Sequence, residues 1–260
     1  MSRVKTARNL LSKRLGEVQP SVAIILGSGC GLELDQVHWS LTASNIPGFV
    51  APSVAGHSGR VTSGVFTNHE VLLMQGRVHY YEGVSTDRVT FQVRLIHELG
   101  IKNIILISAA GGIRATLNPG EIMLVEGHIC AQPLTATYRG RSVYDALWRE
   151  RVIAACTGLT VSSGVYVWTI GPSYETPSEI VAFERRGGDA VGMSLVPEAM
   201  EASTLDMHVL GATIITNSAA GLHEQELNHE DVLRSAEAAR ANLADVIARA
   251  LMQAPQPYRT

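Results

Sequence analysis

Six short apolar runs, each ending near glycine or a small polar residue, constrain most strongly how this chain can fold. Apolar runs of this length without regular polar alternation are typical of strands that a sheet buries on both faces. They are Val22–Leu26, Val71–Met74, Ile104–Ile107, Ile122–Val125, Val165–Ile170 and Ala212–Ile215. Helical patterns lie between the runs, and strands alternating with helices indicate an α/β protein. We therefore predict a central mixed, largely parallel sheet flanked by helices.

Three helices have recognisable start signals. They are predicted over residues 85–100, 176–187 and 228–251. Ser85 or Thr86 can cap the first helix, and Gly100 can end it. The second begins with the capping box Thr176–Glu179, in which proline takes the first helical position. Asn228 can open the third, because an acidic residue follows three positions later.

The composition favours one folded domain. The chain has 260 residues, of which 46% are hydrophobic and 17% are charged. This excludes a disordered chain, which needs low hydrophobicity and high charge. No visible repeat, linker or low-complexity tract divides the sequence, so we predict a single domain over residues 1–260 with its core at about residues 22–251.

Charge, cysteine count and hydropathy exclude several classes of partner. With 21 basic and 24 acidic residues the formal net charge is −3, which argues against a nucleic-acid-binding protein. Three cysteines, Cys30, Cys130 and Cys156, are too few and too scattered for a disulfide framework. No apolar run approaches the ~18 residues of a membrane span, and the first residues lack a signal-peptide core. We expect a reduced, cytoplasmic protein without membrane partners.

The residues directly after the apolar runs are the candidates for a ligand site. In α/β sheets, ligands bind beyond the carboxyl ends of the strands. The residues at these positions are Gly27–Gly31, which contains Ser28, then Arg77, His79, Ala109–Gly112, Glu175, Met193, Ser194, Thr216 and Asn217. The glycines of the first segment can expose backbone N–H groups to an anion, or they can simply make a tight turn. Their spacing matches neither G-x-G-x-x-G nor a Walker loop, which weakens both nucleotide interpretations.

Arg77 and His79 lie on the same side of the chain if the extended conformation persists beyond the strand. Arginine offers a permanently charged planar donor for phosphate, and histidine offers a second donor. The alternative is a surface arginine beside a buried, satisfied histidine. His57, between glycines in residues 56–59, carries the same ambiguity. No H-E-x-x-H motif, no G-x-S-x-G motif and no cluster of aspartates occurs, so no metal site is predicted.

Read in order, these segments resemble the trimeric type of purine nucleoside phosphorylase, in the nucleoside phosphorylase family that includes methylthioadenosine phosphorylases. The resemblance covers about residues 22–251. The matching segments are Ile25–Gly29, Gly56–Arg60, Met74–Gly83, Ala109–Gly112, Gly171–Thr176, Val191–Ser194, Ile215–Asn217 and Asn228–Glu230.

The resemblance implies a role for each matching position. Phosphate would be held by Ser28, His57, Arg77, His79, the backbone of Ala109, and Ser194. The ribose would lie among Tyr81, Met193 and His229, with His229 reaching the 5′-hydroxyl. Tyr174 and Val191 would flank the purine, and Glu175 and Asn217 would bind its edge. Asn217, His79 and Glu175 would be the catalytic residues. The resemblance also implies a homotrimer that needs no metal or organic cofactor, because inorganic phosphate is the co-substrate.

The sequence departs from the family pattern at three places. Ser108 stands where relatives commonly have asparagine, and Ser218 stands where lysine is frequent. Residues 133–151 are shorter than the loop that brings an aromatic side chain into the ribose site of a neighbouring subunit. Tyr138 and Tyr144 are the candidates to replace that side chain.

The reaction implied is phosphorolysis of purine nucleosides with a preference for the 6-oxopurine compounds inosine and guanosine. The alternatives are a 5′-methylthioadenosine-type phosphorylase, a nucleoside hydrolase, and a catalytically silent or dinucleotide-binding α/β protein. If Arg77 binds phosphate, we expect Arg77→Ala to impair phosphate use and to leave the fold intact.

Overall fold

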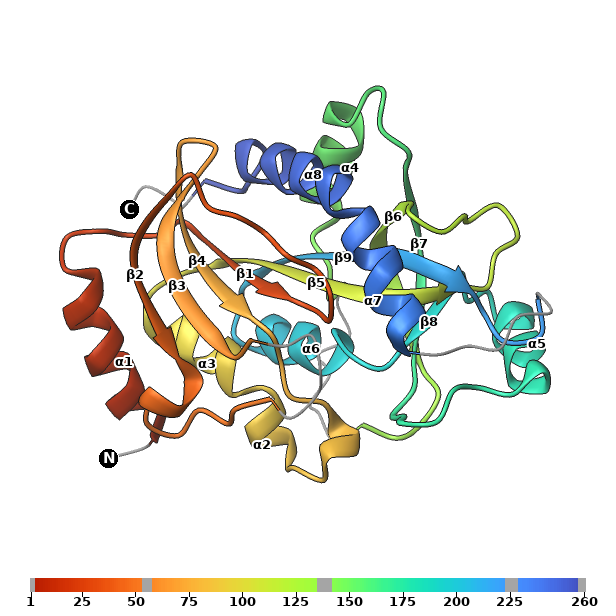
Figure 1. The fold of residues 1–260 in the computed structure, drawn as a ribbon, viewed down its shortest axis with the longest axis horizontal. Helices are drawn as coiled ribbons and strands as arrows, with labels where there is room; N and C mark the ends of the chain where they lie inside the picture. Colours follow the sequence, from red (N-terminus) through yellow and green to blue (C-terminus); the bar gives the residue numbers. More distant parts are fainter. Residues whose placement is uncertain (1–2, 53–57, 135–141, 223–228, 257–260) are drawn as a thin grey trace.

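A nine-stranded mixed sheet organises the part of the chain that the computed structural model describes, residues 3–52, 58–134, 142–222 and 229–256. The strand order is β2-β3-β4-β1-β5-β8-β7-β6-β9, with a further pairing of β5 to β9 (Figure 1). The strands are β1 Val22–Leu26, β2 Gln36–Thr42, β3 Arg60–Phe66, β4 His69–Gln75, β5 Asn103–Gly112, β6 Ile122–Cys130, β7 Val161–Trp168, β8 Ala190–Gly192 and β9 His208–Ser218.

The predicted fold class is confirmed, and each predicted apolar run lies wholly or mostly in a strand. The pairs β1–β4, β1–β5, β5–β9, β6–β7 and β7–β8 are parallel. The pairs β2–β3, β3–β4, β5–β8 and β6–β9 are antiparallel. The predicted strand at Val165–Ile170 begins earlier, at Val161, and ends at Trp168.

Three strands lacked an apolar run in the sequence. Strand β2 is the edge of the sheet and is largely solvent-accessible, so its residues are mixed in polarity. Strand β3 is interrupted in sequence by Thr62, Ser63 and Gly64, although all three are buried. Strand β8 has only three residues. Strand β3 was therefore not predicted, because several of its buried residues are polar or glycine.

Helices cover both faces of the sheet. They are α1 Arg3–Leu15, α2 Thr86–Val89, α3 Phe91–Glu98, α4 Ala146–Ala155, α5 Pro177–Arg185, α6 Val196–Thr204, α7 His229–Ala238 and α8 Arg240–Met252, with the 3₁₀ helices η1 Ala43–Asn45 and η2 Tyr80–Glu82. Helix α1 was not predicted. The helix predicted over residues 85–100 is divided at Thr90, and the last predicted helix is divided at Ala239.

The capping predictions had different outcomes. At α5, the Thr176 hydroxyl accepts the Glu179 N–H and Glu179 accepts the Thr176 N–H at 2.7 Å, which confirms the capping box. Ser85 takes the N-cap position of α2 but makes no side-chain capping bond. Asn228 lies outside the described residues.

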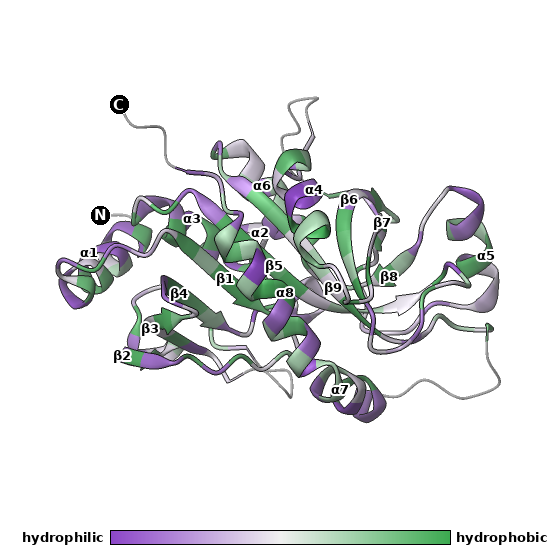
Figure 2. Ribbon diagram, turned by 90° about the horizontal axis from the view of Figure 1, so that it is seen from above, coloured by the Kyte–Doolittle hydropathy of each residue, from purple (hydrophilic) through white to green (hydrophobic). Residues whose placement is uncertain are grey.

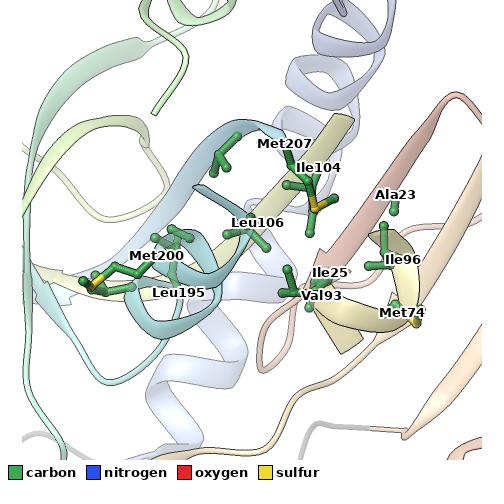
Figure 3. Packing of buried hydrophobic residues seen from close by; sticks show 14 of the residues in the cluster. Ala23, Ile25, Met74, Val93, Ile96, Ile104, Leu106, Leu195, Met200 and Met207 are labelled. Carbon is green, nitrogen blue, oxygen red and sulfur yellow. The ribbon is translucent and has the colours of Figure 1, made fainter. Parts of the chain in front are cut away.

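The sheet separates two large apolar clusters. One face packs against α1, α3 and α6, and the other packs against α4, α7 and α8. Figure 2 shows α3 and α6 on one side of β1 and β5, with α7 and α8 on the opposite side. Figure 3 shows the first cluster, where Ile25 and Leu106 from the strands meet Val93 of α3 and Leu195 beside α6. This double covering explains why the central strands are continuously apolar. No helix of the described residues has the length and hydropathy to cross a membrane.

Candidate active site

A cavity of about 290 Å³ opens where β1, β4, β5, β7 and β9 end. The strand ends, the loops that follow them and the first turn of α7 form its wall; α7 lies beside β9 (Figure 1). The lining residues are Ser28, His79, Tyr81, Ala109, Ala110, Gly111, Pro172, Tyr174, Glu175, Val191, Gly192, Met193, Ser194, Thr216, Asn217, Ala219, His229 and Val232. The cavity therefore occupies the edge at which an α/β sheet binds ligands.

Most predicted site residues meet in this one cavity. Those that line it are Ser28, His79, Tyr81, Ala109, Tyr174, Glu175, Val191, Met193, Ser194, Asn217 and His229. Arg77 does not line it, and His57 lies outside the described residues. Residues separated by up to 201 positions, from Ser28 to His229, thus converge on a single site.

Arg77 lies behind the cavity wall as half of a buried ion pair. Its side chain and that of Glu198 are each 1% exposed, and Nε lies 2.9 Å from Glu198 Oε2. Its guanidinium also donates to the backbone oxygen of Ile107 at 2.5 Å and of Ile25 at 3.4 Å. Burial raises the pKa of the Glu198 carboxyl, and the Arg77 charge opposes that shift.

This geometry corrects the expectation that Arg77→Ala leaves the fold intact. The substitution would leave Glu198 buried without its cationic partner, and breaking a buried pair on one side is strongly destabilising. The guanidinium still lies at the edge of the site, because a second, smaller cavity of about 10 Å³ is lined by Arg77 together with His79 and Ser194. Arg77 is therefore both a structural group and a positive charge close to the cavity.

Gly27 makes room for this guanidinium. A Cβ at this position would lie 3.0 Å from Arg77 Nη1 and 3.0 Å from the Ile107 oxygen. Gly29, two residues later, has φ +70°, a conformation that glycine adopts without strain. The two glycines thus serve a close approach and a tight turn, while Ser28 between them lines the cavity.

His79 is a neutral imidazole at the cavity wall. Burial, reinforced by the nearby Arg77 charge, lowers its pKa from 6.5 to about 4, against the opposing effect of Glu82. Glu82 accepts the backbone N–H of His79 at 2.6 Å, and its Oε1 lies 3.4 Å from His79 Nδ1. The ring stacks on Tyr81 at a centroid distance of 4.8 Å. A neutral imidazole can donate from one nitrogen and accept at the other.

Glu175 is held from behind the cavity. The hydroxyl of Thr169, a buried residue directly after β7, donates to Glu175 Oε1 at 2.7 Å. Glu175 itself is only partly buried and lines the cavity. It presents an acceptor group to a ligand edge.

Hydrogen bonds define the orientation of the Asn217 amide. Its Nδ2 donates to the backbone oxygen of Ser218 at 2.8 Å, and only the amide nitrogen can make that bond. Oδ1 therefore faces the Thr216 hydroxyl, which donates to it at 2.8 Å. Each amide atom keeps a further bonding position, one N–H on Nδ2 and one lone pair on Oδ1. A ligand edge can consequently meet both a donor and an acceptor here.

Apolar and aromatic side chains provide the remaining walls. Tyr174 is 38% exposed, whereas Val191 is buried against Ile180 and Phe183 of α5. Met193 packs so closely on Gly171 that a Cβ there would overlap its sulfur. An aromatic ring opposite an aliphatic side chain suits a flat, largely apolar ligand.

Tyr166 is a functional candidate that the sequence analysis missed. It is fully buried, and burial raises its pKa to about 12 against the opposing effect of the nearby Ser108, Ser194 and Arg77. A Cβ at Gly192 would overlap its hydroxyl, so glycine is required at that cavity-lining position. Ser108, one of the departures from the family pattern, thus lies beside a tyrosine hydroxyl that also neighbours Ser194.

Two other buried partners were missed, and one of them left a signal. Glu198 stands in the otherwise apolar segment of α6, where an acidic side chain without a local base indicates a buried ion pair. Thr169 left no signal, because threonine is common in strands.

Of the two candidates for the crossing aromatic, the structure describes Tyr144, which does not line this cavity. Tyr144 is 3% exposed, and its hydroxyl lies 3.1 Å from His128 Nδ1 inside the core, so it cannot enter a neighbouring subunit. Tyr138 lies outside the described residues. Among residues that are described, no group of three or more His, Cys, Asp or Glu side chains could hold a metal ion.

The fold and the cavity at its strand ends define the class of this protein. The chain belongs to the Phosphorylase superfamily, which matches residues 21–252. The resemblance seen in the sequence is thereby confirmed.

Individual relatives and solved structures match most of this chain. The chain is 39% identical over 239 residues to purine nucleoside phosphorylase 1 of Geobacillus stearothermophilus, which covers 86% of this chain and 87% of that protein. A purine nucleoside phosphorylase of Schistosoma mansoni in complex with inosine is 29% identical with a TM-score of 0.86, covering 98% and 97% of the two chains. A structure of Schistosoma mansoni purine nucleoside phosphorylase with adenosine gives a TM-score of 0.85 at 30% identity and covers 98% of each chain. The structure of isoform 2 from that organism, in complex with cytosine and ribose-1-phosphate, has a TM-score of 0.87 and is 29% identical in sequence. The match covers 98% of this chain and 97% of that chain.

Proposed function

We propose that this chain catalyses the phosphorolysis of purine nucleosides to a free purine and ribose 1-phosphate. The observation that carries the proposal is the single cavity in which hydroxyl and imidazole donors beside the Arg77 charge meet a carboxylate and an oriented amide. The first set suits a phosphate, and the second suits the edge of a base. The names of the relatives, which are purine nucleoside phosphorylases, support this activity.

Phosphate would be held by Ser28, His79, Ser194 and the Ala109 backbone, with Arg77 supplying positive charge from behind. The neutral state of His79 suits this role, because its ring can donate to a phosphate oxygen or accept from a protonated one. His57, which the structure does not describe, remains a predicted ligand of the same phosphate. The electropositive end of the cavity would orient the phosphate oxygen toward the anomeric carbon.

The chemical step would break the bond between C1′ and N9 while a phosphate oxygen bonds C1′. The ribose gains oxocarbenium character as in glycoside hydrolysis, and the electron pair of the broken bond passes to the purine. The amide of Asn217 would stabilise the negative charge near N7 and O6, an effect worth about 3 kcal/mol by comparison with a single oxyanion donor. Hydrogen phosphate gives up its proton when it becomes the sugar phosphate, and the leaving base takes up one proton at N7 to become the neutral purine. Tyr81, Met193 and His229 would surround the ribose.

The base preference would follow from Glu175 and Asn217. A 6-oxopurine carries an N1–H group that can donate a hydrogen bond to the Glu175 carboxylate, whereas adenine has an unprotonated N1. The free N–H of Asn217 suits a 6-oxo group better than a 6-amino group. Mispaired buried groups cost about 1–3 kcal/mol each, so at least tenfold discrimination against adenosine is expected.

The test of the function is phosphate-dependent cleavage of inosine, guanosine, adenosine and 5′-methylthioadenosine in parallel. Ribose 1-phosphate as the sugar product, with no cleavage when phosphate is omitted, is the expected result. Free ribose would indicate the hydrolase, and preferential cleavage of 5′-methylthioadenosine would indicate the second alternative. Cleavage of adenosine as efficient as that of inosine would contradict the assignments of Glu175 and Asn217 together.

We also propose that the enzyme is a homotrimer of a single domain that needs no cofactor beyond its co-substrate phosphate. The family match over residues 21–252 supports one domain. Light scattering tests the assembly, and a fully active monomer would contradict it. The cytoplasmic location stays a prediction from the sequence.

A further inference from the structure

A buried hydroxyl holds one oxygen of the Glu175 carboxylate. Thr169 is 5% exposed and does not line the cavity, yet its Oγ1 donates to Glu175 Oε1 at 2.7 Å. The backbone N–H of Thr169 donates to the Gly192 oxygen at 3.0 Å, which ties this residue to β8. Thr169 is therefore fixed to the sheet, whereas Glu175, whose carboxylate it binds, lies in the segment between β7 and α5.

The apolar neighbours of Thr169 do not explain a hydroxyl at this position. The preceding residues Tyr166, Val167 and Trp168 are fully buried, and valine would match the shape of threonine here. A hydroxyl buried without a partner costs about 1–3 kcal/mol. Its partner is Glu175, so the hydroxyl and the carboxylate form one unit.

The bond restricts what the carboxylate can do. A glutamate side chain loses up to about 2 kcal/mol of rotamer entropy when it becomes ordered. The Thr169 bond orders the carboxylate before a ligand arrives. One oxygen is engaged by Thr169, and no hydrogen bond to another described residue engages Oε2.

We propose that Thr169 is a positioning residue that determines base specificity by holding the Glu175 carboxylate in the orientation that accepts a hydrogen bond from N1–H of a 6-oxopurine. This inference rests on the proposed function, in which Glu175 binds the purine edge. It makes specificity depend on a residue outside the cavity. Thr169 acts through Glu175 and is not itself a catalytic residue.

The experiment compares Thr169→Val, which removes the hydroxyl at nearly constant volume, with the matched control Thr169→Ser, which retains it. Guanine binding is measured by calorimetry, and KM and kcat are measured for guanosine, adenosine and phosphate. The expected result for Thr169→Val is about tenfold weaker guanine binding, the size of one hydrogen bond to a charged group. Thr169→Ser should remain within about threefold of the unmodified enzyme.

Two readouts distinguish positioning from a general structural effect. Thr169→Val should raise KM for guanosine with little change in KM for adenosine or phosphate. In a Glu175→Gln background the same substitution should add little further loss, because the two residues act as one unit. Should the valine variant fail to fold, Thr169→Ala removes the hydroxyl without adding a methyl group and replaces it in each comparison.

The outcomes separate this inference from the function on which it rests. If Glu175→Gln weakens guanine binding and Thr169→Val does not, the positioning role is wrong and the proposed function stands. If Glu175→Gln itself leaves guanine binding unchanged, Glu175 does not bind the base and both assignments fail. Equal losses for guanosine, adenosine and phosphate in Thr169→Val, shared by Thr169→Ser, would also overturn the positioning role.

Discussion

Replacing Arg77 tests how far stability and phosphate binding depend on one side chain. We consider Arg77→Met, Glu198→Leu and the double variant that carries both substitutions. Each single variant leaves one member of a pair that is 1% exposed on both sides. The double variant removes both charges and fills the space with apolar side chains of similar size.

The expected magnitudes follow from the burial of the pair. Breaking a buried pair on one side costs about 3–5 kcal/mol, because the remaining charge is desolvated without compensation. That is a large fraction of the ~5–15 kcal/mol by which most proteins are stable. The double variant should recover most of this loss, since apolar replacement of a buried pair is often neutral. It still forfeits the bonds to the Ile107 and Ile25 oxygens, so we expect it within about 2 kcal/mol of the unmodified protein.

Urea unfolding and phosphate saturation are measured on all three variants at one protein concentration. With a slope of about 3 kcal/mol/M, each single substitution should lower the unfolding midpoint by about 1 M or more. The double variant should recover most of the loss in the urea midpoint. It should not recover the affinity for phosphate, because the positive charge of Arg77 is gone. A normal midpoint in Arg77→Met would refute the structural role of the pair, and normal phosphate saturation in the double variant would refute the role of Arg77 in binding.

Further predictions concern the imidazoles, the base edge and the tight packing beneath the cavity. The pKa of His79 is about 4 in the folded protein and 6.5 in the unfolded chain. The free energy of unfolding should therefore be highest above pH 6.5 and fall by up to about 3 kcal/mol toward pH 4. The His79→Gln variant should lack this part of the fall, and urea midpoints that fall equally in both proteins would contradict the prediction. Asn217→Asp should narrow the rate gap between guanosine and adenosine, and an equal loss for both substrates would deny it the discriminating role. His229→Ala should slow inosine more than 5′-methylthioinosine in parallel assays; faster turnover of 5′-methylthioinosine by the unmodified enzyme would contradict the assignment of His229 to the 5′-hydroxyl. Gly192→Ala should destabilise by about 1–3 kcal/mol in thermal unfolding, and Tyr166→Phe should relieve part of that loss.

Apolar runs that end at glycine or small polar residues were sufficient to predict most strands of the central sheet. Strands β1, β4, β5 and β9 are apolar runs because helices cover both of their faces, so burial and hydrophobicity coincide there. The coincidence ends at β3, where Thr62 and Ser63 are buried but polar, and at the edge strand β2. Strand β3 depends on pairing with β4, and β2 depends on pairing with β3, which no local pattern encodes.

The site was predictable for a different reason. Ser28 follows β1, Glu175 lies in the segment between β7 and α5, and Asn217 lies at the carboxyl end of β9. The carboxyl ends of the parallel strands meet at one edge, so these side chains line one cavity. Their partners were not predictable, because Thr169 and Glu198 act only after the chain brings distant segments together: Arg77 and Glu198 are separated by 121 positions. Local sequence therefore identifies groups that can touch a ligand better than it identifies groups that orient them.

Arg77 shows why binding and folding are difficult to separate at this site. Its guanidinium is bound to Glu198 of α6 and to backbone oxygens of β1 and β5, so the charge is held in place before any ligand arrives. A preorganised charge costs nothing to orient when phosphate binds. The same bonds tie a helix to two central strands, so the energy that orients the charge also stabilises the fold. Glu198 in turn neutralises part of that charge, and removing it alone should strengthen the electrostatic attraction for phosphate while it weakens the protein.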